Sequence, residues 1–301
     1  MSEAVSSAAT RAAANATASH QVRAPLTFII PQDEKPYFES SAVTGGAPKV
    51  HFQTEEKPVT IHDMRPLTGK LSLDAEGFEL LHAPTAVRDL YDDEAIDTAY
   101  TAEIVELLKK HMGADNAVVF DMTRRSDGGE GAANRDGLRG PATRVHVDYT
   151  PKSGPQRAKD CIGETEVGRI LSNGGRLVQI NVWRPIAGPV KRAPLALADA
   201  TSVKRDELIA TDQRFPDRTG EIYQLAFGEG QRWYYAPEME RDEVILIKSW
   251  DSLGDEDTTY PAHGAFQYPD QDPKAPPRES IEVRTYVIFG PGNANAKGAG
   301  R

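Results

Sequence analysis

Residues 144–149 read Arg-Val-His-Val-Asp-Tyr (RVHVDY), and polar side chains alternate with apolar ones along the stretch. Side chains of a β-strand point alternately to the two faces of its sheet, so this pattern predicts a strand with one buried face. Val145 and Val147 would pack into a core, and His146 and Asp148 would share the opposite face. That face offers one neutral nitrogen and one anionic oxygen side by side, a pair suited to a metal ion.

Other short strand patterns surround this stretch, and glycine- and proline-rich turns separate them. The regular strand–helix alternation of a parallel α/β sheet is missing from the sequence. We therefore expect a mostly β protein with flanking helices, built as a double-stranded β-helix, a cupin-like jelly roll. The expected helices are 93–112 and 155–171, and the other expected strands are 26–30, 49–53 and 59–63 (these two as a hairpin), 117–121, 177–183, 221–227, 232–236, 243–248 and 280–289.

The composition restricts the class of protein. The 301 residues carry a formal net charge of -10, which argues against nucleic acid as a partner, and no apolar run is long enough to cross a membrane. The single cysteine, Cys161, excludes an internal disulfide and favours a reducing, cytoplasmic location. We expect one domain over 23–290 between tails at 1–22 and 291–301, and the oligomeric state stays open.

A third metal ligand must come from elsewhere in the chain. Among seven histidines, His263 stands out because it follows an apolar strand, precedes the last strand, and has Gly264 beside it to allow close backbone approach. His146, Asp148 and His263 would together form the two-histidine, one-carboxylate arrangement of non-haem Fe(II) oxygenases. Three positions on the metal would stay open.

Those open positions can accept a chelating 2-oxoacid and O2. The distal carboxylate of 2-oxoglutarate would then need an arginine, whose planar guanidinium binds carboxylates through two hydrogen bonds. Arg278 follows His263 by fifteen positions, and Ser280 could add a hydroxyl. Arg284 is the substitute, because strand alternation places it on the same face, although it could instead pair with Glu282 or Asp251.

The motifs HVDYTP, INVWRPIAGPV, PLALAD, VILIKSWDS, HGAF and PRESIEVR occur in this order. The stretch from Asp121 to Phe289 resembles a family of fungal and bacterial oxygenases that includes gibberellin desaturase-like and cephamycin hydroxylase-like proteins. The resemblance implies a double-stranded β-helix, Fe(II), 2-oxoglutarate, and hydroxylation, desaturation or ring closure on a small metabolite of secondary metabolism. It carries the two histidines and the aspartate of the family motif onto His146, Asp148 and His263, and the family arginine onto Arg278.

Further residues could serve this site. Asn181 shares a strand face with Trp183 and could bind the cosubstrate. Trp183 could line the substrate pocket, although core packing is the commoner fate of an aromatic side chain on a strand. A place in the pocket and a place in ordinary packing are equally compatible with the sequence for Tyr149, Arg184, Tyr234 and Trp250.

The expected activity is that of an Fe(II)- and 2-oxoglutarate-dependent dioxygenase, with succinate and CO2 as co-products. A cupin-type metalloenzyme that does not use 2-oxoglutarate is one alternative, and a non-catalytic binding protein on the same fold is another. A methyltransferase is disfavoured, because no glycine-rich strand-to-helix loop is present.

Overall fold

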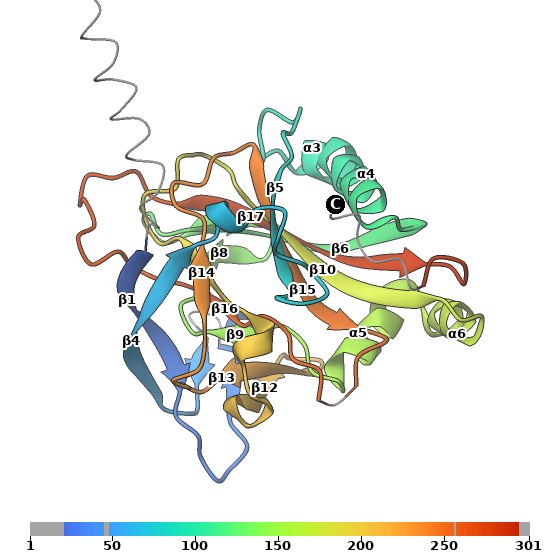
Figure 1. Ribbon diagram of the computed structural model, residues 1–301, viewed down its shortest axis with the longest axis horizontal. Helices are drawn as coiled ribbons and strands as arrows, with labels where there is room; N and C mark the ends of the chain where they lie inside the picture. The colour runs from blue at the N-terminus through green and yellow to red at the C-terminus, as the bar shows by residue number, and fades with distance from the viewer. Residues whose placement is uncertain (1–20, 45–47, 256, 295–301) are drawn as a thin grey trace, which may run out of the picture.

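The computed structural model describes residues 21–44, 48–255 and 257–294 (Figure 1). Two large sheets pack against each other through a shared apolar cluster that includes Trp183 and Ile245 from one sheet and Leu197 from the other. In the five-stranded sheet the order is β5 (Phe78–His82), β15 (Glu243–Asp251), β10 (Arg176–Pro185), β17 (Glu279–Phe289) and β6 (Asn116–Ser126).

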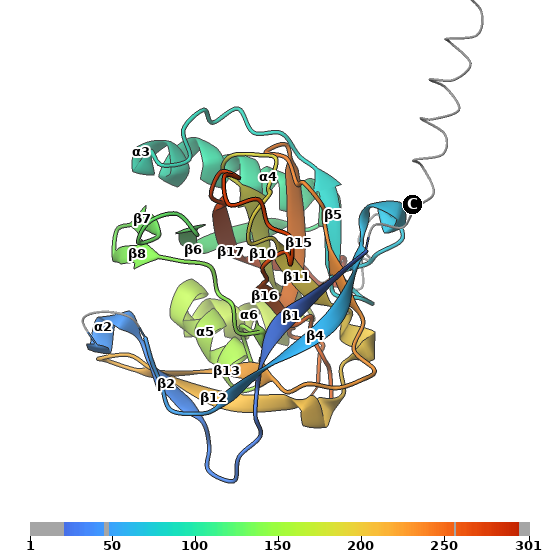
Figure 2. The same ribbon diagram turned by 90° about the vertical axis from the view of Figure 1, so that its left-hand side faces the viewer.

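The other sheet has ten strands and curls around one end of the molecule (Figure 2). Its order is β1 (Gln21–Ile29), β4 (Thr54–Asp63), β14 (Trp233–Tyr235), β11 (Leu195–Ala198), β16 (His263–Ala265), β9 (His146–Val147), β13 (Thr219–Leu225), β12 (Leu208–Arg214), β2 (Tyr37–Glu39) and β3 (Lys49–Val50). β7 (Ala132–Asn134) and β8 (Gly137–Arg139) form a separate hairpin.

A helical stretch covers the outer face of the five-stranded sheet, as the sequence predicts for 93–112. It runs through α3 (Asp93–Ala95), a π-helical turn (Ile96–Tyr100) and α4 (Thr101–Met112). Asp92 caps its first turn, and Gly113, with φ 68°, ends it. Its buried face packs on Val178, Ile180 and other residues of the central strands.

The predicted helix 155–171 is two helices, α5 (Ser153–Ile162) and α6 (Glu164–Ser172). Gly163 separates them with φ 98°, a conformation that residues with a Cβ rarely adopt. The remaining helices are short: α2 (Ser41–Thr44) and the 3₁₀ turns Arg65–Leu67, Ala200–Ser202 and Arg205–Glu207.

Two local predictions are wrong. The expected hairpin of 49–53 with 59–63 does not form, because β4 pairs with β1 and β14 while β3 pairs with β2. The expected strand 144–149 is regular only at His146–Val147, since Arg144 makes an isolated bridge to Thr27 and Asp148 lies in a bend. The other predicted strands are present with shifted ends.

The fold is the predicted mostly β jelly roll with flanking helices. The expected tails at 1–22 and 291–301 lie largely outside the described residues, although Gln21 and Val22 already belong to β1. Within the part of the chain that the structure describes, no helix is long and apolar enough to cross a membrane.

Candidate metal centre

A single row of residues across the ten-stranded sheet carries both predicted histidine ligands. Neighbouring strands pair His263 directly with His146, and the row continues to Leu197 and Tyr234 on one side and Gln224 on the other. Paired residues on adjacent strands project to the same face. Val145 and Val147 project to the opposite face, into a core beneath β1 and β4. The alternation of RVHVDY therefore separates metal face from core face, as predicted.

The side chains of His146, Asp148 and His263 converge, with one potential ligand atom from each within 4.8 Å of the others. The rings of His146 and His263 have centroids 4.7 Å apart, and His146 Nε2 lies 3.5 Å from Asp148 Oδ1. In both histidines Nδ1 lies by a backbone carbonyl, that of Arg144 at 2.8 Å and that of Pro261 at 3.2 Å. A carbonyl can only accept, so Nδ1 carries the proton and Nε2 keeps a free lone pair.

Two imidazole nitrogens and one carboxylate oxygen are a donor set suited to Fe(II). Burial, together with the neighbouring His146, lowers the pKa of His263, which favours the neutral form that a metal needs. For Asp148, burial by itself would raise the pKa, but Arg284 and the two histidines lower it well below its usual value. The three residues therefore fit a divalent iron ion in their ligating protonation states.

The second carboxylate oxygen of Asp148 is held by the five-stranded sheet. Asn181 donates from Nδ2 to Oδ2 of Asp148 at 2.6 Å, and Arg284 Nε lies 3.5 Å from the same oxygen. Gln179 in turn donates to Oδ1 of Asn181 at 2.7 Å. Oδ1 of Asp148 is thus the oxygen left facing His146.

Arg284 is surrounded by acidic groups. It donates to Asp121 Oδ2 at 2.6 Å and forms a close ion pair with Glu282, in addition to its contact with Asp148. Burial acts against the charge of Arg284, but these carboxylates raise its pKa well above the usual value. Arg284 therefore already has a carboxylate at each of its three nitrogens.

Arg278 has a different environment. Its exposed fraction is 2%, and its guanidinium donates to the backbone oxygen of Ala193 at 2.8 Å and lies over the Trp183 ring at 5.7 Å. Its Nε has no hydrogen-bond partner, and no carboxylate of the described residues comes within ion-pair distance of its guanidinium. Burial, with a contribution from Arg125, lowers the pKa of Arg278 to about 10, while the more distant carboxylates of Asp127 and Glu282 act in the opposite direction. Among the described residues, Arg278 is therefore a buried cation without a carboxylate in direct ion-pair contact.

The remaining predicted site residues fall into two groups. Ser280, Asn181 and Trp183 lie on the metal side of the five-stranded sheet, because their strands pair them with Arg125, Arg284 and Glu282, respectively. Tyr234 belongs to the row of His263 and also packs near Phe78.

Arg184 lies on the far side of β10, where it donates to Tyr100 and to the backbone oxygens of Ala83 and Arg241. Alternation along the strand turns it away from the metal ligands, so a place in the substrate pocket is incorrect for Arg184. Trp250 packs against the start of α5 and the ring of Tyr286, in a cluster that also holds Tyr149.

The sequence reasoning did not single out Glu282 or Gln179 as part of the site. Glu282 holds Arg284, and Gln179 holds Asn181. Strand alternation could have indicated both, because each lies two positions from a predicted site residue. Each partner lies on the same strand, because Glu282 and Arg284 belong to β17 and Gln179 and Asn181 belong to β10.

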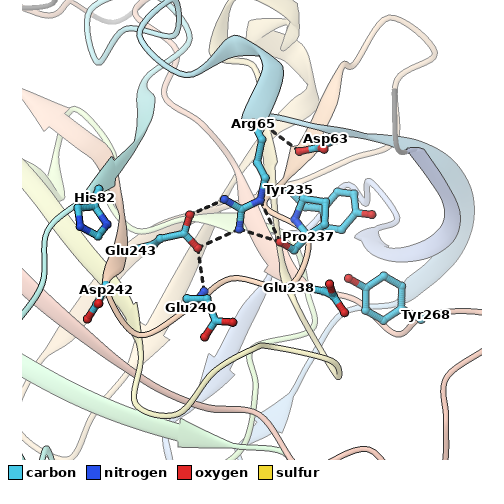
Figure 3. A pocket seen from close by; sticks show the side chains of 10 residues that line it. All are labelled: Asp63, Arg65, His82, Tyr235, Pro237, Glu238, Glu240, Asp242, Glu243 and Tyr268. Atoms are coloured by element: carbon cyan, nitrogen blue, oxygen red, sulfur yellow. Dashed lines mark hydrogen bonds and ion pairs between the residues drawn. The ribbon is translucent and has the colours of Figure 1, made fainter. Parts of the chain in front are cut away.

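A cavity of about 820 Å³ lies away from the three ligands, and Arg65 crosses it to reach Glu243 and the backbone oxygen of Pro237 (Figure 3). It is lined by Asp63, Arg65, His82, Tyr235, Pro237, Glu238, Glu240, Asp242, Glu243 and Tyr268. Residues of both sheets line it, since Tyr235 belongs to β14 of the ten-stranded sheet and His82 and Glu243 lie at the ends of β5 and β15 of the five-stranded sheet.

Known proteins resemble this chain over most of its length. Residues 26–288 match the family described as Oxidoreductase/YMDC permease-like domain. A protein of Aspergillus novofumigatus named Fe(II)/2-oxoglutarate-dependent dioxygenase NvfI is 33% identical over 255 residues, which cover 81% of this chain and 88% of the relative. A hydroxylase/desaturase of Hormonema carpetanum, EfuI, is 29% identical over 267 residues, 82% of this chain and 88% of the relative.

The fold is also shared with a solved structure. That of the iron and alpha-ketoglutarate-dependent endoperoxidase NvfI superposes with a TM-score of 0.77 and 30% identity, covering 90% of this chain and 98% of the other. The chain belongs to this family of Fe(II)/2-oxoglutarate-dependent oxygenases. The predicted enzyme class, with its need for Fe(II), 2-oxoglutarate and O2 and its small-molecule substrates, is confirmed.

Proposed function

We propose that His146, Asp148 and His263 hold the Fe(II) of this oxygenase and that Arg278 binds the distal carboxylate of 2-oxoglutarate. The observation that carries the assignment of Arg278 is its missing counter-ion. An isolated buried charge is costly, and its cost falls when a ligand of opposite charge arrives. A dicarboxylate that binds the metal at one end and Arg278 at the other would supply that charge.

Arg284 is the weaker candidate for this contact. Asp121, Asp148 and Glu282 already occupy its nitrogens, so a further carboxylate would have to displace one of them. We assign Arg284 and Asn181 to the orientation of Asp148 instead. With Oδ2 held by both, Asp148 would bind the metal through Oδ1 alone, which keeps other metal positions open for the cosubstrate and O2.

The protein would supply geometry and protonation state to the reaction. When bound, Fe(II) supplies the redox chemistry that couples oxidative decarboxylation of 2-oxoglutarate, to succinate and CO2, to oxidation of the substrate. His146 and His263 would offer Nε2 because their Nδ1 protons are engaged by backbone carbonyls. Ser280, buried between β10 and β6, would add a hydroxyl near the distal carboxylate.

The reaction on the substrate would be a hydroxylation, a desaturation or an oxidative ring closure. The names of the relatives, a hydroxylase/desaturase and an endoperoxidase, support oxidation of a metabolite carbon skeleton. A cytoplasmic location and the absence of a nucleic-acid partner remain part of this proposal. They are supported by the single cysteine and the net charge of -10.

The proposal is tested by succinate formation in a metabolite screen with Fe(II) and 2-oxoglutarate. We expect substrate-stimulated succinate release by the wild type and none above background for His146→Ala and Asp148→Ala, with both variants still folded. Each variant should also bind Co(II) at least tenfold more weakly in a calorimetric titration. Activity and Co(II) affinity equal to wild type in both variants would refute the ligand assignment.

A further inference from the structure

Beyond the metal row, the same face of the ten-stranded sheet continues as an apolar wall. His146 pairs with Gln224 on β13, and Gln224 pairs with Ile209 on β12. The next strand after β12 is β2 (Figure 2), and there Phe38 pairs with Gln213 of β12. Directly paired residues project to one side, and alternation along β12 puts residue 213 on the side of residue 209. Phe38 therefore faces the same side of the sheet as the two histidine ligands.

Part of this wall is only partly covered by the rest of the protein. Ile209 and Ile222 are half-buried, and Thr211, which is paired with Ile222, is fully buried between them. In the part of the chain that the structure describes, neither isoleucine belongs to an apolar core cluster, and neither do Phe38 and Phe52. Their neighbours Leu208, Tyr223 and Leu225 on the other side of the same strands are buried in a core. Ile209, Ile222 and Phe52 are only partly covered, whereas Phe38 is buried beside them.

Arg144 adds one positive charge to this wall. It lies two residues before His146, and Val145 between them points into the core, so Arg144 projects to the metal side. Its guanidinium carbon lies 5.8 Å from the Phe38 ring centroid and 5.9 Å from that of Phe52. The two rings frame the cation and hold its plane in place.

The charge of Arg144 is not neutralised within the described residues. No carboxylate there lies within ion-pair distance, and its buried Nε has no hydrogen-bond partner. Arg176 and Arg284 differ in this respect, because Arg176 is paired with Asp251, and Arg284 with Asp121 and Glu282.

We propose that Arg144, framed by Phe38 and Phe52, binds an anionic group of the substrate, and that the apolar wall beside it holds the substrate's hydrocarbon body. The substrate class is then an amphipathic metabolite with a carboxylate or a similar anion at one end. Strand rise separates Arg144 from His146 by about 7 Å along the sheet, so an anion at Arg144 would leave the hydrocarbon body close to the metal row. This inference rests on the proposed metal site, because that site decides which face of the sheet meets the substrate.

A matched pair of dyes tests the proposal without knowledge of the natural substrate. The anion 8-anilinonaphthalene-1-sulfonate and neutral N-phenyl-1-naphthylamine differ only by the sulfonate. Their dissociation constants are measured by fluorescence on the enzyme loaded with Fe(II) and 2-oxoglutarate under nitrogen. Arg144→Gln should weaken binding of the anionic dye roughly 10- to 100-fold, the usual effect of losing one charge-assisted contact, and change the neutral dye less than twofold. The affinity of Arg144→Lys for the anionic dye should lie between those of wild type and Arg144→Gln, because lysine keeps the charge but lacks the planar guanidinium.

Arg205→Gln is the matched control. Arg205 lies 4.9 Å from the Tyr223 ring centroid, on the other face of the same sheet, and its loss should leave both dyes unaffected. An unchanged anionic-dye affinity in Arg144→Gln, an equal loss for both dyes, or no binding of the anionic dye to wild type would each overturn the proposal. Failure of the metal and cosubstrate assignment would appear separately, as absent 2-oxoglutarate binding by wild type in anaerobic calorimetry.

Discussion

Asn181 reaches from the five-stranded sheet to Asp148 beside the ten-stranded sheet, with its Nδ2 at 2.6 Å from Oδ2 of the carboxylate. The contact joins the two halves of the jelly roll at the metal centre. It also occupies one oxygen of Asp148 and leaves the other directed toward His146. Gln179 donates to the Asn181 amide oxygen, so the orientation of Asp148, a proposed metal ligand, depends on a strand that contributes none of the three proposed ligands.

Asn181→Ala should weaken metal binding without removing any ligand. The carboxylate of Asp148 would lose its neutral donor and rotate more freely. Loss of such a supporting hydrogen bond typically costs about 10- to 100-fold in metal affinity. Co(II) titration of Asn181→Ala and Gln179→Ala measures this, and we expect the smaller effect for Gln179→Ala, which acts through Asn181. Wild-type affinity in Asn181→Ala would contradict a positioning role.

Substitution of Arg278, which directly precedes β17, and of Arg284, which lies within β17, should have different effects on ligand binding. Arg278→Gln should raise the dissociation constant of 2-oxoglutarate roughly 10- to 100-fold and leave Co(II) affinity near wild type, because Arg278 contacts no metal ligand. Arg284→Gln should weaken Co(II) binding as well, because it frees Asp148 and leaves Glu282 buried without its partner. Calorimetric titrations of both variants with 2-oxoglutarate and with Co(II) measure the two dissociation constants. The reverse pattern would move the cosubstrate contact to Arg284.

Gly154 in the first turn of α5 should not tolerate alanine. In the middle of a helix alanine is favoured over glycine by about 1 kcal/mol, but a Cβ at Gly154 would lie 2.4 Å from Cδ1 of Trp250. Overpacking of this kind costs about 1–3 kcal/mol, so Gly154→Ala should lower the free energy of unfolding.

Gly168 in α6 is the control, because a Cβ there meets nothing within 4 Å. Gly168→Ala should raise the free energy of unfolding by about 0.5–1 kcal/mol. Urea denaturation of both variants measures whether the free energy of unfolding falls for Gly154→Ala and rises for Gly168→Ala. Equal effects would mean that Trp250 moves aside without cost.

Asp251 should make the free energy of unfolding depend strongly on pH in the acid range. Burial would raise its pKa, but the ion pairs with Arg176 and Lys248 lower it below the usual value. A carboxyl whose pKa is lower in the folded state stabilises the protein above its unfolded-state pKa of about 3.9, and that stabilisation is lost as the pH falls through the folded-state pKa.

Asp251→Asn should therefore cost about 3 kcal/mol of unfolding free energy at pH 7, since it removes one partner of a buried pair. The difference from wild type should shrink at pH values below about 4. Urea denaturation from pH 3 to 7 measures it. A difference that does not change with pH would contradict the role of the charge.

The sequence by itself determined the class of fold and the enzyme family, and it singled out the three residues proposed as metal ligands. Its turns and strand periods require a mostly β chain, and RVHVDY decides which side chains face the core. The sequence did not predict which strands pair with each other. The segments 49–53 and 59–63 have the pattern of a hairpin, but β3 pairs with β2 and β4 pairs with β1. Period-two alternation fixes a strand's faces and not its neighbours.

Only the tertiary structure distinguishes the surroundings of Arg278 from those of Arg284, on which the proposed assignment rests. Both lie on the same strand face by alternation, and the difference between them is the set of carboxylates brought by β6, β17 and the bend after β9. The contacts of Arg184 and Arg144 also became visible only in the tertiary structure: Arg184 donates to Tyr100, and Arg144 lies by two phenylalanine rings. Charge compensation depends on distances between segments far apart in the chain, and a sequence pattern carries no such distances.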